Sequence, residues 1–216
     1  MADIVIDVVS DVVCPWCFEG QRRLGRALAS LPNIDAVVRW RPFQLDPTIP
    51  PGGVDHRRRM EQKFGSAERV AAAEARLTEL GAAEGIRFRF DRIDRSPNTL
   101  DAHRLIRWAG EHGPAVQNAL AAELFSRYFE QGEDVGHPDV LARAAAAAGM
   151  PEKGWCDRLA GDIDRDAVRH EAADFSRVGV SGVPCFILGG RYAVSGAQEA
   201  AVLAQAIEQM AGMVAQ

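Results

Sequence analysis

Apolar residues near the N-terminus follow first the pattern of a strand and then that of a helix. Residues 4–9 are β-branched and almost continuously apolar, as in a parallel strand that is buried on both faces. Apolar side chains then recur at helical spacing from residue 15 to about residue 30, and residues 36–43 again have the composition of a strand. The pattern predicts a βαβ unit at the start of the chain.

The middle of the chain has a different character. A Pro- and Gly-rich loop at residues 46–53 ends the first unit, and residues 55 to about 178 are mostly helical in pattern. One short extended segment is expected at residues 86–90, where apolar and basic residues alternate. We expect Pro97, Pro114 and Pro138 at first helical positions. Two apolar stripes at helical spacing are formed by Val70, Ala73, Leu77 and Leu80, and by Val116, Leu120 and Leu124.

Strand patterns return near the C-terminus. Residues 183–188 and 191–194 flank a Gly-Gly turn, which predicts a hairpin, and residues 201–213 predict a final helix. The order βαβ, many helices and ββα predicts an α/β protein with a thioredoxin fold interrupted by a large all-helical insertion. We expect a discontinuous thioredoxin-like domain at residues 1–54 and 171–216, and a helical insertion domain at residues 55–170.

Candidate chemistry lies where the first strand meets the first helix, in the motif Cys14-Pro15-Trp16-Cys17. Pro15 suits the first helical position, which makes Cys14 the cap residue at the positive end of the helix dipole. We expect this environment to favour the Cys14 thiolate. Cys17 follows one helical turn later, at about the separation that a disulfide requires. The motif therefore predicts a thiol pair that can close and open.

Net charge and cysteine usage narrow the range of functions that the chain can have. A net charge of −5 argues against nucleic acid as the main partner, and the basic cluster at residues 56–59 is expected to be a solvated helix face. Acidic residues at the N-terminus and the lack of a long apolar segment predict a cytoplasmic protein with no membrane partner. Since cytosolic thiols are kept reduced, a CxxC motif there indicates redox catalysis or metal binding.

Five segments carry a resemblance to a known family, and they span nearly the whole chain in the expected order. They are CPWC at residues 14–17, WRPFQL at 40–45, NTLDAHR at 98–104, GVSGVP at 179–184 and SGAQ at 195–198. Together they resemble the DsbA-like thioredoxin-fold oxidoreductases, in their FrnE branch. This group is also related to the glutathione-dependent 2-hydroxychromene-2-carboxylate isomerases, which generally lack the full CxxC.

The resemblance implies a thiol-disulfide oxidoreductase in which Cys14 attacks and Cys17 resolves. It also implies that the Val183–Pro184 bond is cis and lies against the cysteine pair, where Val183 can pair with an incoming extended peptide. Protein or small-molecule disulfides are the expected substrates of a monomer or homodimer that requires no metal or organic cofactor, with glutathione as a redox partner or cosubstrate. The alternative is a glutathione-dependent isomerase or transferase.

Several further residues are candidates for the site, and some of them have two interpretations. Trp16 is expected to be exposed or half-exposed at the mouth of the site. His103 either lines the active-site cleft or is a buried histidine that ties two helices together, and Asn98 either contacts substrate or caps a helix. Cys185 and Cys156 are expected to be small buried residues. Two alternatives remain: Cys185 as a third redox thiol, and a zinc site built from all four cysteines. The candidate substrate contacts are Pro15, Trp16, Val183, Pro184, Asn98 and His103.

Overall fold

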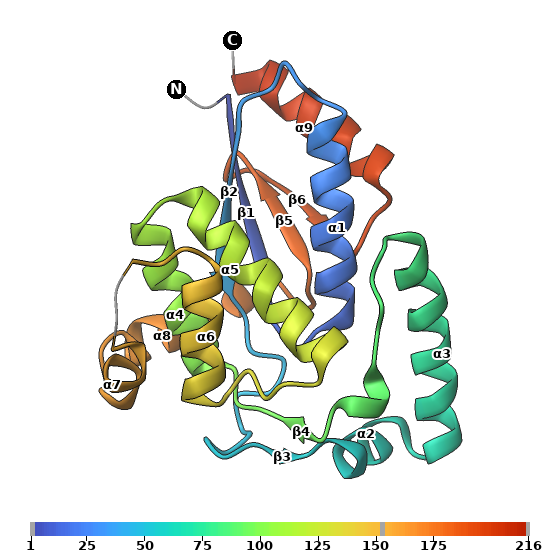
Figure 1. Cartoon of the computed structure of the whole chain (residues 1–216). Helices are drawn as coiled ribbons and strands as arrows, with labels where there is room; N and C mark the ends of the chain where they lie inside the picture. The colour runs from blue at the N-terminus through green and yellow to red at the C-terminus, as the bar shows by residue number, and fades with distance from the viewer. Residues whose placement is uncertain (1–2, 152–153, 215–216) are drawn as a thin grey trace.

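A computed structural model describes residues 3–151 and 154–214 and shows a central four-stranded sheet (Figure 1). Its strand order is β2-β1-β5-β6, with β1 parallel to β2 and antiparallel to β5, and β5 antiparallel to β6. This is the sheet of a thioredoxin fold, as the sequence predicts. The strands are β1 (Ile4–Ser10), β2 (Ala36–Pro42), β5 (Cys185–Leu188) and β6 (Tyr192–Ser195).

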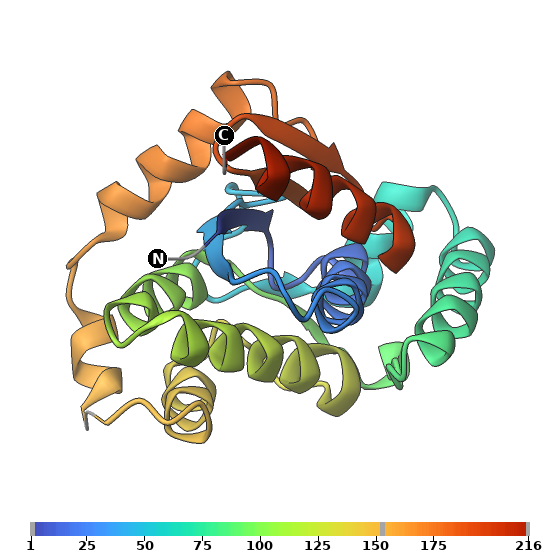
Figure 2. The same ribbon diagram turned by 90° about the horizontal axis from the view of Figure 1, so that it is seen from above.

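Helix α1 (Pro15–Ala29) follows β1 and completes the predicted βαβ unit. It packs beside α9 (Ala200–Val214), the predicted C-terminal helix, and the two helices lie together in both views (Figures 1 and 2). The β2 edge of the sheet is contacted by helices α4 (Leu100–Glu111), α5 (Pro114–Ser126) and α8 (Arg165–Arg177). The sheet is therefore enclosed by helices from both halves of the chain.

The long central segment is helical, as predicted. A two-stranded ladder, β3 (Val54–Asp55) with β4 (Arg95–Ser96), closes the base of an α2–α3 hairpin, which stands at the side of the molecule (Figure 2). The central helices are α2 (His56–Phe64), α3 (Ala67–Ala83), α4 (Leu100–Glu111), α5 (Pro114–Ser126), α6 (Pro138–Ala147), α7 (Trp155–Ala160) and α8 (Arg165–Arg177), with a 3₁₀ turn at Phe90–Arg92 and a π-helical turn at Arg127–Gln131.

Two local predictions are wrong. Residues 86–90 form no strand, because residues 86–89 have no regular secondary structure and Phe90 begins a 3₁₀ turn. Ile86 and Phe88 are buried, which accounts for the alternating pattern. The segment pairs with no neighbouring strand in the described part of the chain, and Arg89 N instead donates to the carbonyl of Phe129 at 2.7 Å. Pro97 is not at a first helical position, because α4 begins three residues later at Leu100, whereas α5 and α6 do begin at Pro114 and Pro138.

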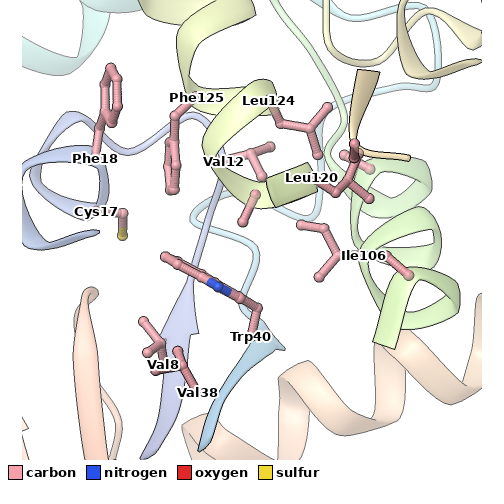
Figure 3. Packing of buried hydrophobic residues seen from close by; sticks show 14 of the residues in the cluster. Val8, Val12, Cys17, Phe18, Val38, Trp40, Ile106, Leu120, Leu124 and Phe125 are labelled. Atoms are coloured by element: carbon pink, nitrogen blue, oxygen red, sulfur yellow. The ribbon is translucent and has the colours of Figure 1, made fainter. Parts of the chain in front are cut away.

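One aromatic cluster joins the first helix to the insertion (Figure 3). Phe18 of α1 is fully buried and stacks on Phe125 of α5, with ring centroids 5.3 Å apart and an interplanar angle of 7°. Trp40 of β2 meets the same Phe125 ring at 5.8 Å, and its indole N–H donates to Asn118 Oδ1 at 2.6 Å. Phe18, the residue after Cys17, therefore packs against the helical insertion, and this contact limits movement of the first turn of α1.

None of the described helices is long and apolar enough to cross a membrane.

Candidate active site

Cys14 occupies the position that the sequence predicts, as the cap residue of α1. Its backbone is extended (φ −96°, ψ 114°), Pro15 begins the helix, and the Cys14 carbonyl accepts the N–H groups of Cys17 and Phe18. The Cys14 N–H donates to the carbonyl of Asp11 at 3.0 Å, which closes the turn between β1 and α1. The turn thus places the Cys14 sulfur at the positive end of the helix dipole.

The two thiols have different surroundings. Both thiols are buried, with Cys14 4% and Cys17 1% exposed, but Cys14 lines a cavity and Cys17 is not part of its lining. Burial and the adjacent Cys14 thiol hold the pKa of Cys17 well above its usual range, although the Ser10 hydroxyl and the Asp11 backbone act in the opposite direction. Both cysteines are free thiols. The pair therefore has one sulfur beside the cavity and one that is shielded by protein.

The loop that precedes β5 lies against the cysteine pair. The Val183–Pro184 bond is cis, as the resemblance implies, and the Val183 carbonyl lies 3.6 Å from Cys14 Sγ. Gly20 of α1 permits this arrangement, because a Cβ at that position would come within 2.9 Å of the Pro184 ring. The close approach of α1 to the loop brings residues 169 positions apart into one site.

Trp16 stands at the mouth of the site, as expected, with 39% of its surface exposed. Pro15, Trp16 and Val183 line the same cavity as Cys14. The structure therefore brings together four of the predicted residues, from α1 and from the loop before β5.

His103 and Asn98 lie outside the lining of this cavity. His103 is 3% exposed, and its Nε2 lies 2.9 Å from the Phe43 carbonyl and 3.5 Å from Asp11 Oδ1, so it ties α4 to the loop that holds Cys14. Asn98 accepts the N–H of Leu100 at the start of α4 and lines a second hollow beside α8. The structure thus supports structural roles for both residues, and substrate contact stays a prediction.

The two remaining cysteines are apart from the redox pair. Cys185 is 2% exposed, as expected, and its neighbours Pro184 and Phe186 face α1, so its own side chain points to the opposite face of the sheet. Cys156, which was also expected to be buried, is instead only partly buried on α7, where Sγ lies 3.5 Å from Asp139 Oδ1. Among the described residues, no three Cys, His, Asp or Glu side chains form a group that could hold a metal ion. The four cysteines therefore do not form the zinc site considered above.

The cavity itself was not predicted. It has a volume of about 390 Å³ and lies between the cysteine motif and the α2–α3 hairpin. The only sequence signal for it is the apolar stripe of α3, of which Val70, Ala73 and Leu77 line the cavity. That stripe has the same spacing as a core-facing stripe, so the pattern alone could not separate the two.

Comparisons with known proteins agree with this architecture. The chain is 33% identical to a probable DsbA oxidoreductase, SCO1869 from Streptomyces coelicolor, over 97% of this chain and 90% of that one, with a TM-score of 0.86. A 2-hydroxychromene-2-carboxylate isomerase superposes with a TM-score of 0.72 at 14% identity, covering 98% of each chain. The cytosolic disulfide reductase DsbM from Pseudomonas aeruginosa, solved with GSH, superposes with a TM-score of 0.57 at 18% identity, covering 98% of this chain and 97% of that one.

The model of the DSBA-like thioredoxin domain matches residues 5–208, which include the cysteine motif, the helical insertion and the cis-proline loop. The chain therefore belongs to the DSBA-like thioredoxin domain family.

Proposed function

We propose that this chain is a cytoplasmic thiol-disulfide oxidoreductase. The Cys14 thiolate attacks one sulfur of a substrate disulfide, forms a mixed disulfide and releases the other substrate sulfur as a thiolate. Deprotonated Cys17 then attacks Cys14 Sγ, which forms the Cys14–Cys17 bond and releases the second substrate thiolate. Two equivalents of a low-molecular-weight thiol such as glutathione return the pair to its reduced form. The sequence of steps requires no metal or organic cofactor.

The observation that carries the proposal is the difference between the two thiols. Of the two buried thiols, only Cys14 lines the cavity, beside the Val183 carbonyl, whereas Cys17 lies outside the lining and has a raised pKa. A buried thiol with a raised pKa is a poor nucleophile towards an external disulfide, but it lies one helical turn from Cys14 and can resolve a mixed disulfide there. The membership of the DSBA-like family and the name of DsbM, a cytosolic disulfide reductase solved with GSH, support this assignment.

Single-cysteine variants test these roles. We expect Cys14→Ser to lose disulfide exchange to the uncatalysed background, because the attacking sulfur is gone. Cys17→Ser should accumulate a mixed disulfide on Cys14, which mass spectrometry of the intact protein detects. Cys156→Ser, on α7 far from the motif in sequence, is a matched control and should keep wild-type exchange. Wild-type exchange by Cys14→Ser would contradict the assignment.

A glutathione-dependent isomerase is the second candidate. It is favoured by the similarity to a 2-hydroxychromene-2-carboxylate isomerase over 98% of the chain and by the small-molecule-sized cavity beside Cys14. Such an enzyme needs glutathione beside Cys14 but no resolving cysteine. Glutathione-dependent isomerisation of a 2-hydroxychromene-2-carboxylate that survives in Cys17→Ser would favour this candidate, and its absence in the wild type would exclude it.

A further inference from the structure

The cavity beside Cys14 has the size and composition of a small-molecule site. Its volume of about 390 Å³ lies within the range of roughly 300–1,000 Å³ that is usual for ligand pockets. One wall is the cysteine motif with Val183, and the opposite wall is the α2–α3 hairpin. A ligand seated there has its reacting sulfur at one end and an apolar enclosure around the rest.

The hairpin supplies apolar surface that the protein core does not use. Along α2 and α3, which the structure describes completely, Gly81 is the only fully buried residue. Apolar side chains of both helices nevertheless line the cavity. They are Met60, Phe64, Val70, Ala73 and Leu77, and they lie opposite Phe90, Tyr128 and Phe129. Because core packing does not account for this stripe, we assign it to ligand contact.

The charged groups of the lining include one ion pair, two further carboxyl groups and one exposed lysine. Arg59 is paired with Asp46 at 2.5 Å, whereas the buried Asp11 Oδ1 has no hydrogen-bond partner among the described residues and lies 3.5 Å from His103 Nε2. Burial raises the pKa of the Glu74 carboxyl group on the α3 wall. Lys63 also lines the cavity but is exposed, with its Nζ over the Phe64 ring. Among the described lining residues, the enclosed part therefore offers no unpaired cationic side chain to the carboxylates of a ligand.

A small group of neutral polar side chains stands among these apolar walls. His56 Nδ1 lies 2.8 Å from Ser96 Oγ, and the Tyr128 hydroxyl donates to the Arg95 carbonyl at 3.2 Å. Burial and the nearby Arg59 lower the pKa of His56, so its imidazole is neutral at pH 7. Neutral imidazole and hydroxyl groups can exchange hydrogen bonds with an uncharged hydroxyl or carbonyl.

From these observations we infer that the cavity binds the organic group of a low-molecular-weight, uncharged, largely apolar disulfide or thiol, with its sulfur at Cys14 and a hydroxyl or carbonyl group at His56 and Ser96. The inference rests on the proposed oxidoreductase function and names its substrate class. Glutathione carries two carboxylates and an ammonium group, so its peptide does not match the enclosed walls. Glutathione, acting as the reductant, instead reaches Cys14 from the open side of the cavity.

Two model disulfides test this substrate class. One is 4,4′-dithiodipyridine, which is aromatic and uncharged at neutral pH, and the other is bis(2-hydroxyethyl) disulfide, which is small and polar. The rate constant of the reduced protein with each probe is divided by that of free glutathione with the same probe, which removes the intrinsic reactivity. The ratio of the two normalised rates is the selectivity, and the wild type should favour the aromatic probe by about tenfold or more.

Substitutions on α3 show whether the cavity is responsible. Ala73→Phe fills the cavity and should lower the selectivity by about tenfold. Leu77→Gln keeps the side-chain size but makes the wall polar, and it should lower the selectivity severalfold. Ala72→Phe adds the same ring to an exposed position of the same helix and should keep the wild-type selectivity. Thermal unfolding of each variant establishes that it is folded.

The outcomes separate the two proposals. Exchange with both probes at a selectivity that Ala73→Phe and Leu77→Gln leave within twofold of the wild-type value would overturn the cavity assignment and leave the oxidoreductase standing. Failure of the wild type to exchange either probe would instead overturn the oxidoreductase function itself.

Discussion

The contact between α1 and α5 and the α2–α3 hairpin use apolar side chains for different purposes. Phe18 of α1 is completely enclosed by Phe125 and Phe129, at centroid distances of 5.3 and 6.1 Å. In the hairpin, by contrast, Val70 and Leu77 remain partly exposed and face the cavity. The α1–α5 contact fixes the position of the CPWC motif, whereas the α2–α3 hairpin leaves apolar surface along the cavity. The comparison shows that an apolar stripe at helical spacing can line a cavity as well as pack into a core.

The largest effect on stability is expected in the first region. Phe18→Ala removes a fully buried ring between α1 and α5, where no side chain can collapse easily into the space. We expect the free energy of unfolding to fall by about 3–5 kcal/mol. Urea unfolding followed by circular dichroism measures this change. A loss as small as that of an exposed substitution would show that the ring does not carry the contact.

A second expected effect on the free energy of unfolding comes from Glu19, one residue after Phe18. Its carboxyl group is fully buried, neither oxygen has a hydrogen-bond partner among the described residues, and Arg23 is 3.9 Å away. Burial is the main cause that raises its pKa from 4.5 to about 7. Since the folded state binds this proton more tightly, the contribution of Glu19 to stability is full below pH 4.5, declines as the pH rises to 7 and is lost above it.

Glu19→Gln should therefore remove this pH dependence. Between pH 5 and pH 8 the wild type is expected to lose about 2–3 kcal/mol that the variant does not lose. Urea unfolding at both pH values measures the difference, with Glu208→Gln on the exposed face of α9 as the matched control. Parallel pH profiles of wild type and Glu19→Gln would mean that the carboxyl group titrates normally in the folded protein.

The smallest effect on stability is expected in the hairpin. Val70→Ala removes two methyl groups from a side chain that is already partly exposed at the cavity. We expect the free energy of unfolding to fall by less than about 1 kcal/mol. Chemical denaturation of Val70→Ala in parallel with Phe18→Ala tests the comparison. Equal losses in the free energy of unfolding of the two variants would remove the distinction between core and cavity.

Much of the fold follows from local patterns in the sequence. The β-branched run of β1, the Pro15 start of α1 and the Gly-Gly turn before β6 each specify their element within a few residues. Residues 86–89 were mispredicted because Ile86 and Phe88 alternate for core packing without a partner strand, and strand pairing depends on distant residues.

The site was predictable only in part. The cysteine pair is contiguous in sequence, and the cis bond of Pro184 follows from the resemblance, so both could be identified. The contact between Asp11 and His103 joins residues 92 positions apart, and the direction of Cys185 depends on which sheet face meets α1. The cavity exists because the α2–α3 hairpin stands away from the core. These features arise only when the chain is folded.

The most direct test of the account is the equilibrium of the wild-type protein in graded glutathione redox buffers, followed by Trp16 fluorescence and by mass mapping of the cysteines. The dithiol mechanism predicts a reversible two-electron transition between two free thiols and a Cys14–Cys17 disulfide, and the midpoint of this transition gives the direction of exchange. A protein that stays reduced throughout, or that stops at a glutathione adduct on Cys14, would contradict the dithiol mechanism.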